Sequence, residues 1–203
     1  MEQLKNKKLI FYMTKILYLH GFASSANSTK ALQLEKYIEH HTKQTNILIP
    51  NIENNILKAV DQINFLMQTE KPTALIGSSL GGFYGTYFAE EYGVKFIGIN
   101  PAVMPPAQMS EYLGENKNYS TGEKFIIDQD QLDLLDAMSA KIKSIKSNFN
   151  YMVLLQSSDQ VLDYRAALGF YKGAYLDVSY GGSHSFENFE DYFEKIRSFL
   201  NMH

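Results

Sequence analysis

The stretch from residue 73 to residue 83 constrains the fold of this chain most strongly, because it leads from an apolar run into a helical pattern through a glycine-flanked serine turn. Its centre, Gly77-Ser78-Ser79-Leu80-Gly81, fits the G-x-S-x-G pattern of a nucleophile elbow. In such an elbow, a sharp strand-to-helix turn holds a serine in a strained backbone conformation with its hydroxyl exposed above a sheet. The glycine register selects Ser79 over Ser78. A lone five-residue match also fits a flexible turn, so its context must decide.

Short apolar runs and helical patterns alternate on both sides of this stretch. Besides the run before Gly77, the predicted strands are 16–19, 46–50, 94–99, 151–156 and 174–180. Helical patterns cover about 28–41, 53–68, 80–92 and 130–145, and two further ones end near Phe170 and Leu200. This alternation is typical of an α/β fold, with a mostly parallel central sheet and helices on both of its faces.

The domain organisation follows from length and local composition. With 203 residues and 45% hydrophobic content, the chain is long enough for one domain with a substantial core. We predict a single α/β domain over residues 15–203, preceded by an N-terminal extension over residues 1–14. The apolar patch at 9–13 is too short for a signal peptide, which favours a cytoplasmic protein. An insert at about 102–146, polar but containing aromatic and methionine side chains, fits either a lid over a pocket or a surface excursion.

Composition excludes several classes of function. The formal charge of −3 gives no electrostatic basis for binding nucleic acid or an anionic membrane. No run reaches the roughly 18 apolar residues that a membrane span needs. The chain has no cysteine, which excludes disulfides, thiolate zinc sites and a cysteine nucleophile. His40 and His41 would point about 100° apart on a helix, so they do not favour a metal site, and we predict neither a metal nor a cofactor.

Serine chemistry needs a base and an acid from elsewhere in the chain. A serine hydroxyl is too weak an acid to attack an ester alone, so a histidine must take its proton and a carboxylate must orient that histidine. In α/β-hydrolases these three arrive in the order serine, acid, histidine. Two histidines follow Ser79, and His184 is the one in a glycine loop, whereas His203 is the last residue. Asp159, directly after a predicted strand, is the favoured acid, and Asp163 is the alternative.

The tetrahedral intermediate of such a reaction needs an oxyanion hole, made of two backbone N–H groups. One comes from the residue after the nucleophile, here Leu80, and the other from the loop after an earlier strand. His20-Gly21-Phe22 is that loop, and the amide of Phe22 is the predicted second donor. Gly21 permits a close approach of the chain, and His20 is predicted to support the loop through hydrogen bonds.

With these residues placed, the chain resembles the YqiA-like esterases, a small group of bacterial α/β-hydrolases. The matching pieces run in order from about residue 15 to residue 200 and are Leu17-Tyr18-Leu19-His20-Gly21-Phe22 with Ser24-Ser25, Gly77-Ser78-Ser79-Leu80-Gly81-Gly82, Asn100-Pro101-Ala102-Val103, Tyr112-Leu113-Gly114-Glu115-Asn116, Thr121-Gly122-Glu123, Asp159-Gln160-Val161-Leu162-Asp163-Tyr164-Arg165 and Gly181-Gly182-Ser183-His184-Ser185-Phe186. The resemblance implies an α/β-hydrolase fold with a reduced sheet, and Ser79, Asp159 and His184 as a catalytic triad. It also implies esterase or thioesterase activity on acyl esters, with acyl-CoA among the candidate substrates. The extra N-terminal residues are the departure from the family pattern, and they bear on the start site and not on the chemistry.

The combined prediction is a serine hydrolase that cleaves a small-molecule acyl ester or thioester through an acyl-enzyme intermediate. Two alternatives stay open. The same triad could serve acyl transfer or C–C bond hydrolysis, and the same fold could serve a non-catalytic protein that binds a small molecule or a partner. The sequence leaves the oligomeric state open.

Overall fold

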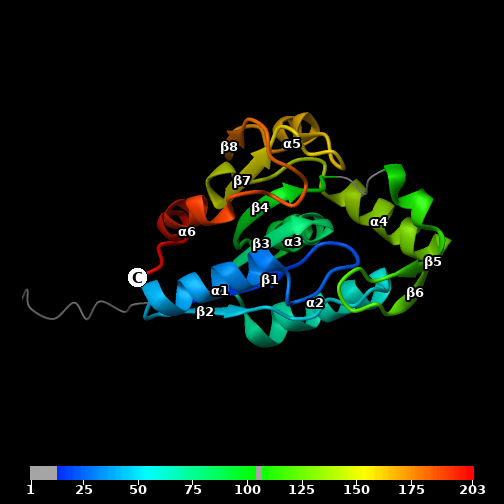
Figure 1. The fold of residues 1–203 in the computed structure, drawn as a ribbon, viewed down its shortest axis with the longest axis horizontal. Helices are drawn as coiled ribbons and strands as arrows, with labels where there is room; N and C mark the ends of the chain where they lie inside the picture. The colour runs from blue at the N-terminus through cyan, green and yellow to red at the C-terminus, as the bar shows by residue number, and fades with distance from the viewer. Residues whose placement is uncertain (1–12, 104–106) are drawn as a thin grey trace, which may run out of the picture.

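The computed structural model of the chain describes residues 13–103 and 107–203 (Figure 1). Its centre is a six-stranded sheet in the order β2-β1-β3-β4-β7-β8, and every adjacent pair of these strands is parallel. The strands of this sheet are β1 (Thr14–Leu19), β2 (Thr45–Leu48), β3 (Ala74–Ser79), β4 (Lys95–Pro101), β7 (Tyr151–Gln156) and β8 (Tyr175–Ser179). The prediction of a parallel central sheet is confirmed.

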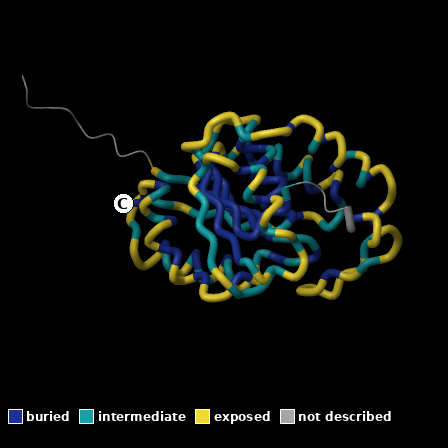
Figure 2. The backbone as a smooth tube through the Cα atoms, turned by 90° about the horizontal axis from the view of Figure 1, so that it is seen from above, coloured by how far each residue is buried: buried dark blue, intermediate teal, exposed yellow. Residues whose placement is uncertain are grey.

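The sheet is buried on both faces because successive apolar residues of its strands point to opposite sides. In β1, Leu17 and Leu19 belong to one buried cluster, while Ile16 and Tyr18 belong to the other. Figure 2 shows this buried backbone in the middle of the molecule, with exposed backbone around it. The continuous apolar runs seen in the sequence are therefore the two-sided interior of the sheet.

Helices cover both faces of the sheet. α1 (Thr29–His41) and α6 (Phe193–Leu200) contribute Leu34 and Ile196 to the cluster on one face. α2 (Ile56–Glu70), α3 (Leu80–Tyr92), α4 (Gln129–Lys141) and α5 (Tyr164–Phe170) contribute to the cluster on the other. Among the described residues, three short 3₁₀ helices complete the helical elements, at Ala107–Tyr112, Asn148–Asn150 and Phe189–Tyr192.

The helix boundaries differ from the predicted ones where a polar side chain caps the first turn. α2 was predicted from about residue 53 but begins at Ile56, because the Asn55 side chain accepts a hydrogen bond from the Lys58 amide at 3.1 Å. α4 likewise begins after Asp128, which caps it, and ends at Lys141, earlier than the predicted residue 145. α3 ends as predicted, with Gly93 in the left-handed conformation at φ 68°.

The strand order changes direction between β1 and β3, which makes this position the topological switch point of the sheet. The chain runs outward from β1 to β2 on one side, and from β3 to β4 and β7 on the other. In open parallel sheets, ligands bind outside the carboxyl ends of the strands at such a switch point. The loop at 20–25 follows β1 and Ser79 ends β3, so both lie at this edge.

The insert at 102–146 contains a feature that the sequence analysis missed. It was expected to be irregular chain followed by a helix, but it forms an antiparallel hairpin of β5 (Gly114–Lys117) and β6 (Lys124–Ile127) before α4. The sequence Gly-Glu-Asn-Lys of β5 lacks the apolar alternation of a strand, so its strand conformation depends on tertiary contacts. A role for the insert as a lid stays a prediction.

The predicted N-terminal extension lies mostly outside the described residues. β1 already begins at Thr14, which pairs with Thr45, so the sheet starts one residue before the predicted domain boundary. The division into an extension and a single domain stays a prediction. Among the helices that the structure describes, none combines the length and the apolar character that crossing a membrane requires.

Candidate active site

Ser79 stands at the junction of β3 and α3 in a strained backbone conformation. It is the last residue of the strand and directly precedes the helix, with φ 54° and ψ −124°. A positive φ is uncommon for a residue with a Cβ atom, and such strain is characteristic of sites where the surrounding structure fixes one side chain in place. The predicted elbow geometry is therefore present at this residue, and Ser78 beside it is buried.

The glycines around Ser79 are required by close packing of the backbone. A Cβ atom on Gly77 would lie 2.2 Å from the carbonyl oxygen of Gly81, and one on Gly81 would lie 2.1 Å from that of Leu19. Neither position has room for a side chain. The G-x-S-x-G spacing thus reflects the crossing of the turn with β1 and with its own helix.

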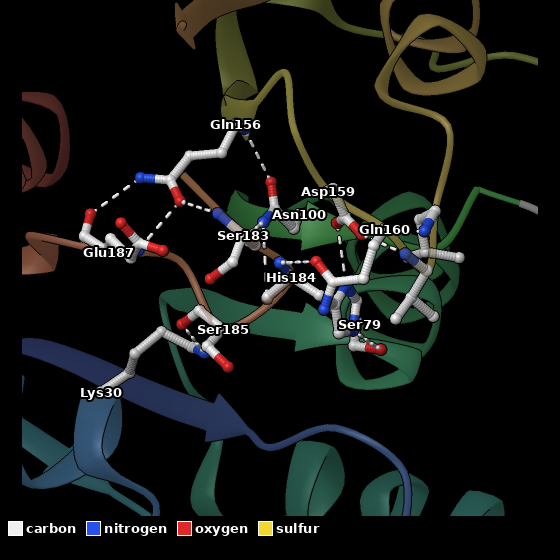
Figure 3. A network of polar contacts seen from close by, with 12 residues as sticks. Lys30, Ser79, Asn100, Gln156, Asp159, Gln160, Ser183, His184, Ser185 and Glu187 are labelled. Atoms are coloured by element: carbon white, nitrogen blue, oxygen red, sulfur yellow. Dashed lines mark hydrogen bonds and ion pairs between the residues drawn. The ribbon is translucent and has the colours of Figure 1, made fainter. Parts of the chain in front are cut away.

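The structure brings Ser79, His184 and Asp159 together from three separate segments (Figure 3). His184 Nε2 lies 3.0 Å from Ser79 Oγ, and His184 Nδ1 lies 2.8 Å from Asp159 Oδ2. The Asp159 side chain is 2% exposed and that of His184 is 21% exposed, so the acid is enclosed while the histidine reaches the surface. This is the hydrogen-bond order of a serine, a base and an orienting acid.

Asp159 is held as an anion by a full set of donors. Burial by itself raises the pKa of the carboxyl, but hydrogen bonds from His184, Leu162 and Val161 and the charge of His184 outweigh it, so the pKa lies below its usual value. The amides of Val161 and Leu162 donate to Oδ1 at 2.8 and 2.9 Å, which leaves Oδ2 to His184. Because Oδ2 accepts, His184 carries its proton on Nδ1 and presents Nε2 to Ser79 as an acceptor.

The alternative acid, Asp163, has a different position. It is exposed, and its Oδ1 accepts a hydrogen bond from the Arg165 amide at 3.0 Å as the N-cap of α5. Asp177, inside β8, pairs instead with Lys195. Of these three carboxylates, Asp159 is the one bonded to His184.

The loop after β1 passes directly against Ser79. A Cβ atom on Gly21 would lie 3.1 Å from Ser79 Cβ, so a side chain there would press on the serine. Phe22 and Leu80, the two predicted oxyanion donors, line one small cavity together with His20 and Gly21. Leu80 is also the first residue of α3, where free N–H groups and the positive end of the helix dipole favour a negative charge.

His20 is a buried, neutral support of this loop. Its Nε2 accepts from the Ile52 amide at 2.9 Å, so Nδ1 must carry the proton, and it donates to the Gly21 carbonyl at 2.9 Å. Burial lowers the pKa of His20, and the hydrogen bond to Gly21 only partly opposes this. The ring therefore fixes the chain on both sides without facing Ser79 through either nitrogen.

Several polar residues at the site were missed by sequence reasoning. Gln156 and Asn100 contact the loop that carries His184, and Asn118 of the insert contacts the loop after β1. Asn100 and Gln156 stand near the carboxyl ends of β4 and β7, where an amide after an apolar run was the signal available in the sequence. Asn118 had no such signal.

The paired histidines of α1 lie at an exposed helix end. His40 Nδ1 bonds to the Lys36 carbonyl at 2.6 Å and His41 Nδ1 to the Tyr37 carbonyl at 2.9 Å. Within residues 13–103 and 107–203, no group of three or more histidine, aspartate or glutamate side chains has the arrangement of a metal site.

Solved structures of other proteins share this fold. Est1E from Butyrivibrio proteoclasticus, solved with ferulic acid bound, superposes with a TM-score of 0.73 at 14% identity, covering 94% of this chain and 89% of that chain. The esterase domain of a Rhodothermus marinus protein gives a TM-score of 0.67 at 20% identity, covering 94% and 88%. The fold is the α/β-hydrolase fold, and its structural neighbours include esterases.

The chain belongs to the uncharacterised protein family UPF0227, whose profile matches residues 15–201. A UPF0227 protein of Pectobacterium atrosepticum is 26% identical over 197 residues, covering 92% of this chain and 99% of that protein. The predicted resemblance to the YqiA-like group of small bacterial α/β-hydrolases is confirmed.

Proposed function

We propose that this protein is a serine hydrolase of acyl esters or thioesters, acyl-CoA thioesters among them. In this proposal Ser79 is the nucleophile, His184 is the general base and acid, and Asp159 orients His184. The backbone amides of Phe22 and Leu80 form the oxyanion hole. The protein needs no metal or organic cofactor for this reaction.

One observation carries the proposal, namely the unbroken line of hydrogen bonds from Ser79 Oγ through the His184 ring to Asp159, with steps of 3.0 and 2.8 Å. A structural histidine would not need a strained serine on one side and an enclosed carboxylate on the other. The positive φ of Ser79 supports the same assignment, because backbone strain of this kind clusters at active sites and Ser79 ends its strand at the switch point where ligands bind.

The first half of the reaction forms the acyl-enzyme. Ser79 Oγ bonds to the acyl carbon while its proton moves to His184 Nε2, and the carbonyl electron pair moves onto oxygen. The amides of Phe22 and Leu80 donate to that oxyanion, aided by the dipole of α3. When the intermediate collapses, the bond to the leaving alcohol or thiol breaks and His184 gives it the proton.

The second half releases the acid. A water molecule attacks the acyl carbon on Ser79 and gives a proton to His184 Nε2, forming a second oxyanion in the same hole. Its collapse breaks the bond to Ser79 Oγ, which regains the proton from His184. Throughout, Asp159 stays ionised and holds the imidazolium, as the low pKa of its carboxyl favours.

Replacement of the nucleophile tests the proposal. Ser79→Ala should lower the hydrolysis of a short p-nitrophenyl ester by a factor on the order of 10³ or more, because the attacking oxygen is lost. Buried Ser78, its neighbour in the elbow, provides the matched control, and Ser78→Ala should keep most of the activity. Both rates are measured on p-nitrophenyl esters and acyl-CoAs of graded chain length.

A fluorophosphonate probe separates hydrolysis from mere binding. The wild-type protein should become labelled at Ser79, and Ser79→Ala should not be labelled. A wild-type protein that neither reacts with the probe nor turns over any ester would support a non-catalytic binding role. Turnover unchanged in Ser79→Ala would move the nucleophile to another residue.

A further inference from the structure

The loop that carries His184 has little structure of its own. This base loop, residues 181–187, contains no helix or strand. Its backbone bends through glycines at 181 and 182, both with positive φ, and its internal hydrogen bond is a single turn from the Phe186 amide to the Ser183 carbonyl at 3.0 Å. Backbone groups beside a partly buried site need partners, so the position of the loop depends on contacts from outside it.

Gln156, the last residue of β7, supplies three of these contacts through one side chain. Its Oε1 accepts from the amides of Ser183 at 3.0 Å and Glu187 at 2.9 Å, and its Nε2 donates to the Glu187 carbonyl at 2.8 Å (Figure 3). The bonded groups stand on both sides of His184 in the chain. Gln156 is 4% exposed, so this amide has little access to water as an alternative partner.

Asn100 of β4 also bonds to the base loop and to Gln156. Its Nδ2 donates to the backbone carbonyls of Ser183 at 3.0 Å and His184 at 3.4 Å, and its Oδ1 accepts from the backbone N–H of Gln156 at 2.9 Å. β4 pairs with both β3 and β7, and the Ala102 amide just after it donates to the Ser79 carbonyl at 3.0 Å. The strand that ends in Ser79 is thereby joined to the loop that presents His184.

The close packing of Gly182 shows how tightly the base loop lies on Gln156. A Cβ atom on Gly182 would lie 2.1 Å from Gln156 Oε1, so a side chain there would displace the Gln156 side-chain amide, and the φ of 74° also favours glycine. Three further side chains hold the same loop. Ser157 Oγ accepts from the Gly181 amide at 3.0 Å, Gln160 Oε1 accepts from the His184 amide at 3.1 Å, and Lys30 Nζ donates to the Ser185 carbonyl at 2.7 Å. Gln156 makes the largest number of these bonds from a buried position.

We propose that Gln156 is the positioning residue for His184, with Asn100 as its partner, and that this pair sets the imidazole within reach of Ser79 and Asp159 at once. The inference rests on the proposed function, because that proposal makes His184 the catalytic base that Gln156 positions. A reacting geometry must be held to about 0.5 Å, and a displacement of about 1 Å can cost about 100-fold in rate. Gln156 and Asp159 leave the same strand end three residues apart, which couples the position of the base to that of its acid.

A second buried glutamine provides the matched control. Gln131 in α4 is 0% exposed, accepts from the Ile56 amide at 2.8 Å and donates to the Ile126 carbonyl at 3.0 Å. Like Gln156, it joins backbone groups of separate segments, but these belong to α2 and β6 and not to the loops around Ser79. Replacing either glutamine therefore removes a buried side-chain amide, but only the replacement of Gln156 removes contacts with the base loop.

The test compares Gln156→Met with Gln131→Met, since methionine keeps the length of glutamine without its hydrogen bonds. Both should lower the midpoint of urea unfolding by comparable amounts, because each leaves buried backbone groups without partners. Gln156→Met alone should lower kcat for a p-nitrophenyl ester by about 100-fold with little change in KM. Gln131→Met should keep the wild-type kcat.

A spectroscopic readout makes the test independent of turnover. In the wild type, the Nδ1–H of His184 is held against Asp159 and should give a far-downfield proton resonance in NMR, which Ser79→Ala should retain. Gln156→Met should broaden or abolish that resonance, and Gln131→Met should leave it in place. If Gln156→Met does not fold, Gln156→Glu replaces it, keeping both acceptor contacts and losing the donor to Glu187, with a smaller expected fall in kcat.

Two results would overturn the inference. A folded Gln156→Met with wild-type kcat and an unchanged His184 resonance would show that the loop positions itself. Equal losses of kcat in both methionine variants would reduce Gln156 to a general contributor to stability. Failure of the proposed function would give a different result. The wild type would then not hydrolyse esters, while the His184 resonance would still change in Gln156→Met.

Discussion

The two loops that meet at Ser79 are held in different ways. The base loop, residues 181–187, is fixed by Gln156 and Asn100, which belong to strands of the central sheet. The loop after β1, residues 20–25 and here called the oxyanion loop, is fixed largely by the insert. Asn118 Nδ2 donates to the Ser24 carbonyl at 2.9 Å, and the Tyr119 amide donates to the Ala23 carbonyl at 2.9 Å.

Aromatic contacts also hold the oxyanion loop against the insert. The Phe22 ring meets Tyr112 at 5.0 Å and Phe125 at 5.6 Å between centroids, in both cases edge to face. Phe22 is also a proposed oxyanion donor. His184 therefore depends on the sheet, whereas Phe22, one of the two proposed oxyanion donors, depends on a peripheral hairpin, and the two should respond to different mutations.

The largest effect is expected where the base loop meets its acid. Asp159→Asn should lower kcat by about 10³- to 10⁴-fold, because an amide nitrogen facing His184 Nδ1 favours the wrong tautomer at Nε2. Asp163→Asn is the control, since an asparagine oxygen can still cap α5, and its kcat should stay within a few-fold of wild type. Steady-state kinetics on a p-nitrophenyl ester measure both. The reverse ranking would transfer the role of acid to Asp163.

A smaller effect is expected from the insert. Asn118→Ala removes the bond to Ser24 and should lower kcat by about 10-fold, since full loss of one oxyanion donor costs about 10²- to 10³-fold and a loosened loop loses part of that. Asn116→Ala is the matched control in the same hairpin, because its Nδ2 bonds to the Tyr112 and Gly114 carbonyls and not to the oxyanion loop.

The outcome of this pair decides whether the insert supports the oxyanion hole. The His184 resonance should be unchanged in Asn118→Ala, because the base loop has its own supports. Equal kcat values for Asn118→Ala and Asn116→Ala would mean that the oxyanion loop keeps its position without the hairpin. A lost His184 resonance in Asn118→Ala would mean that the two loops are not independent.

The contrast between the sheet and the insert also explains which features could be predicted from the sequence. The sheet and its helices were predictable because two-sided apolar runs and helical periodicity are local patterns. The glycine register and the chain order identified Ser79, His184 and Asp159 as candidates, and hydrogen bonds join these three side chains in the structure. Their catalytic roles, like those of Phe22 and Leu80, stay predictions.

What sequence reasoning missed depends on contacts between distant segments. The bond from Asn118 to Ser24 joins residues 94 positions apart, and β5 of the hairpin, with the sequence Gly-Glu-Asn-Lys, carries no apolar alternation that would indicate a strand. Gln156 and Asn100 are single amides at strand ends, a pattern shared by many residues without such a role. Only the fold brings them against the base loop, because side-chain-to-backbone bonds of this kind leave no periodic signal.

The smallest effect concerns the pH dependence of the oxyanion loop. The pKa of buried His20 lies below the ordinary value of 6.5, so the unfolded chain binds a proton at a higher pH than the folded chain does. The contribution of His20 to stability is therefore complete above pH 6.5. It is lost as the pH falls from there toward the lowered pKa, at up to about 1.4 kcal/mol per pH unit.

His20→Gln tests this dependence, because glutamine can donate and accept hydrogen bonds but does not titrate. Urea unfolding at pH 7.5 and pH 5 should show a smaller loss of stability on acidification in the variant than in the wild type. His40→Gln, at an exposed helix end, is the control for the effect of replacing a histidine by glutamine. An equal acid sensitivity of His20→Gln and wild type would mean that the neutral ring is not what couples the oxyanion loop to Ile52, and would leave the insert as its main support.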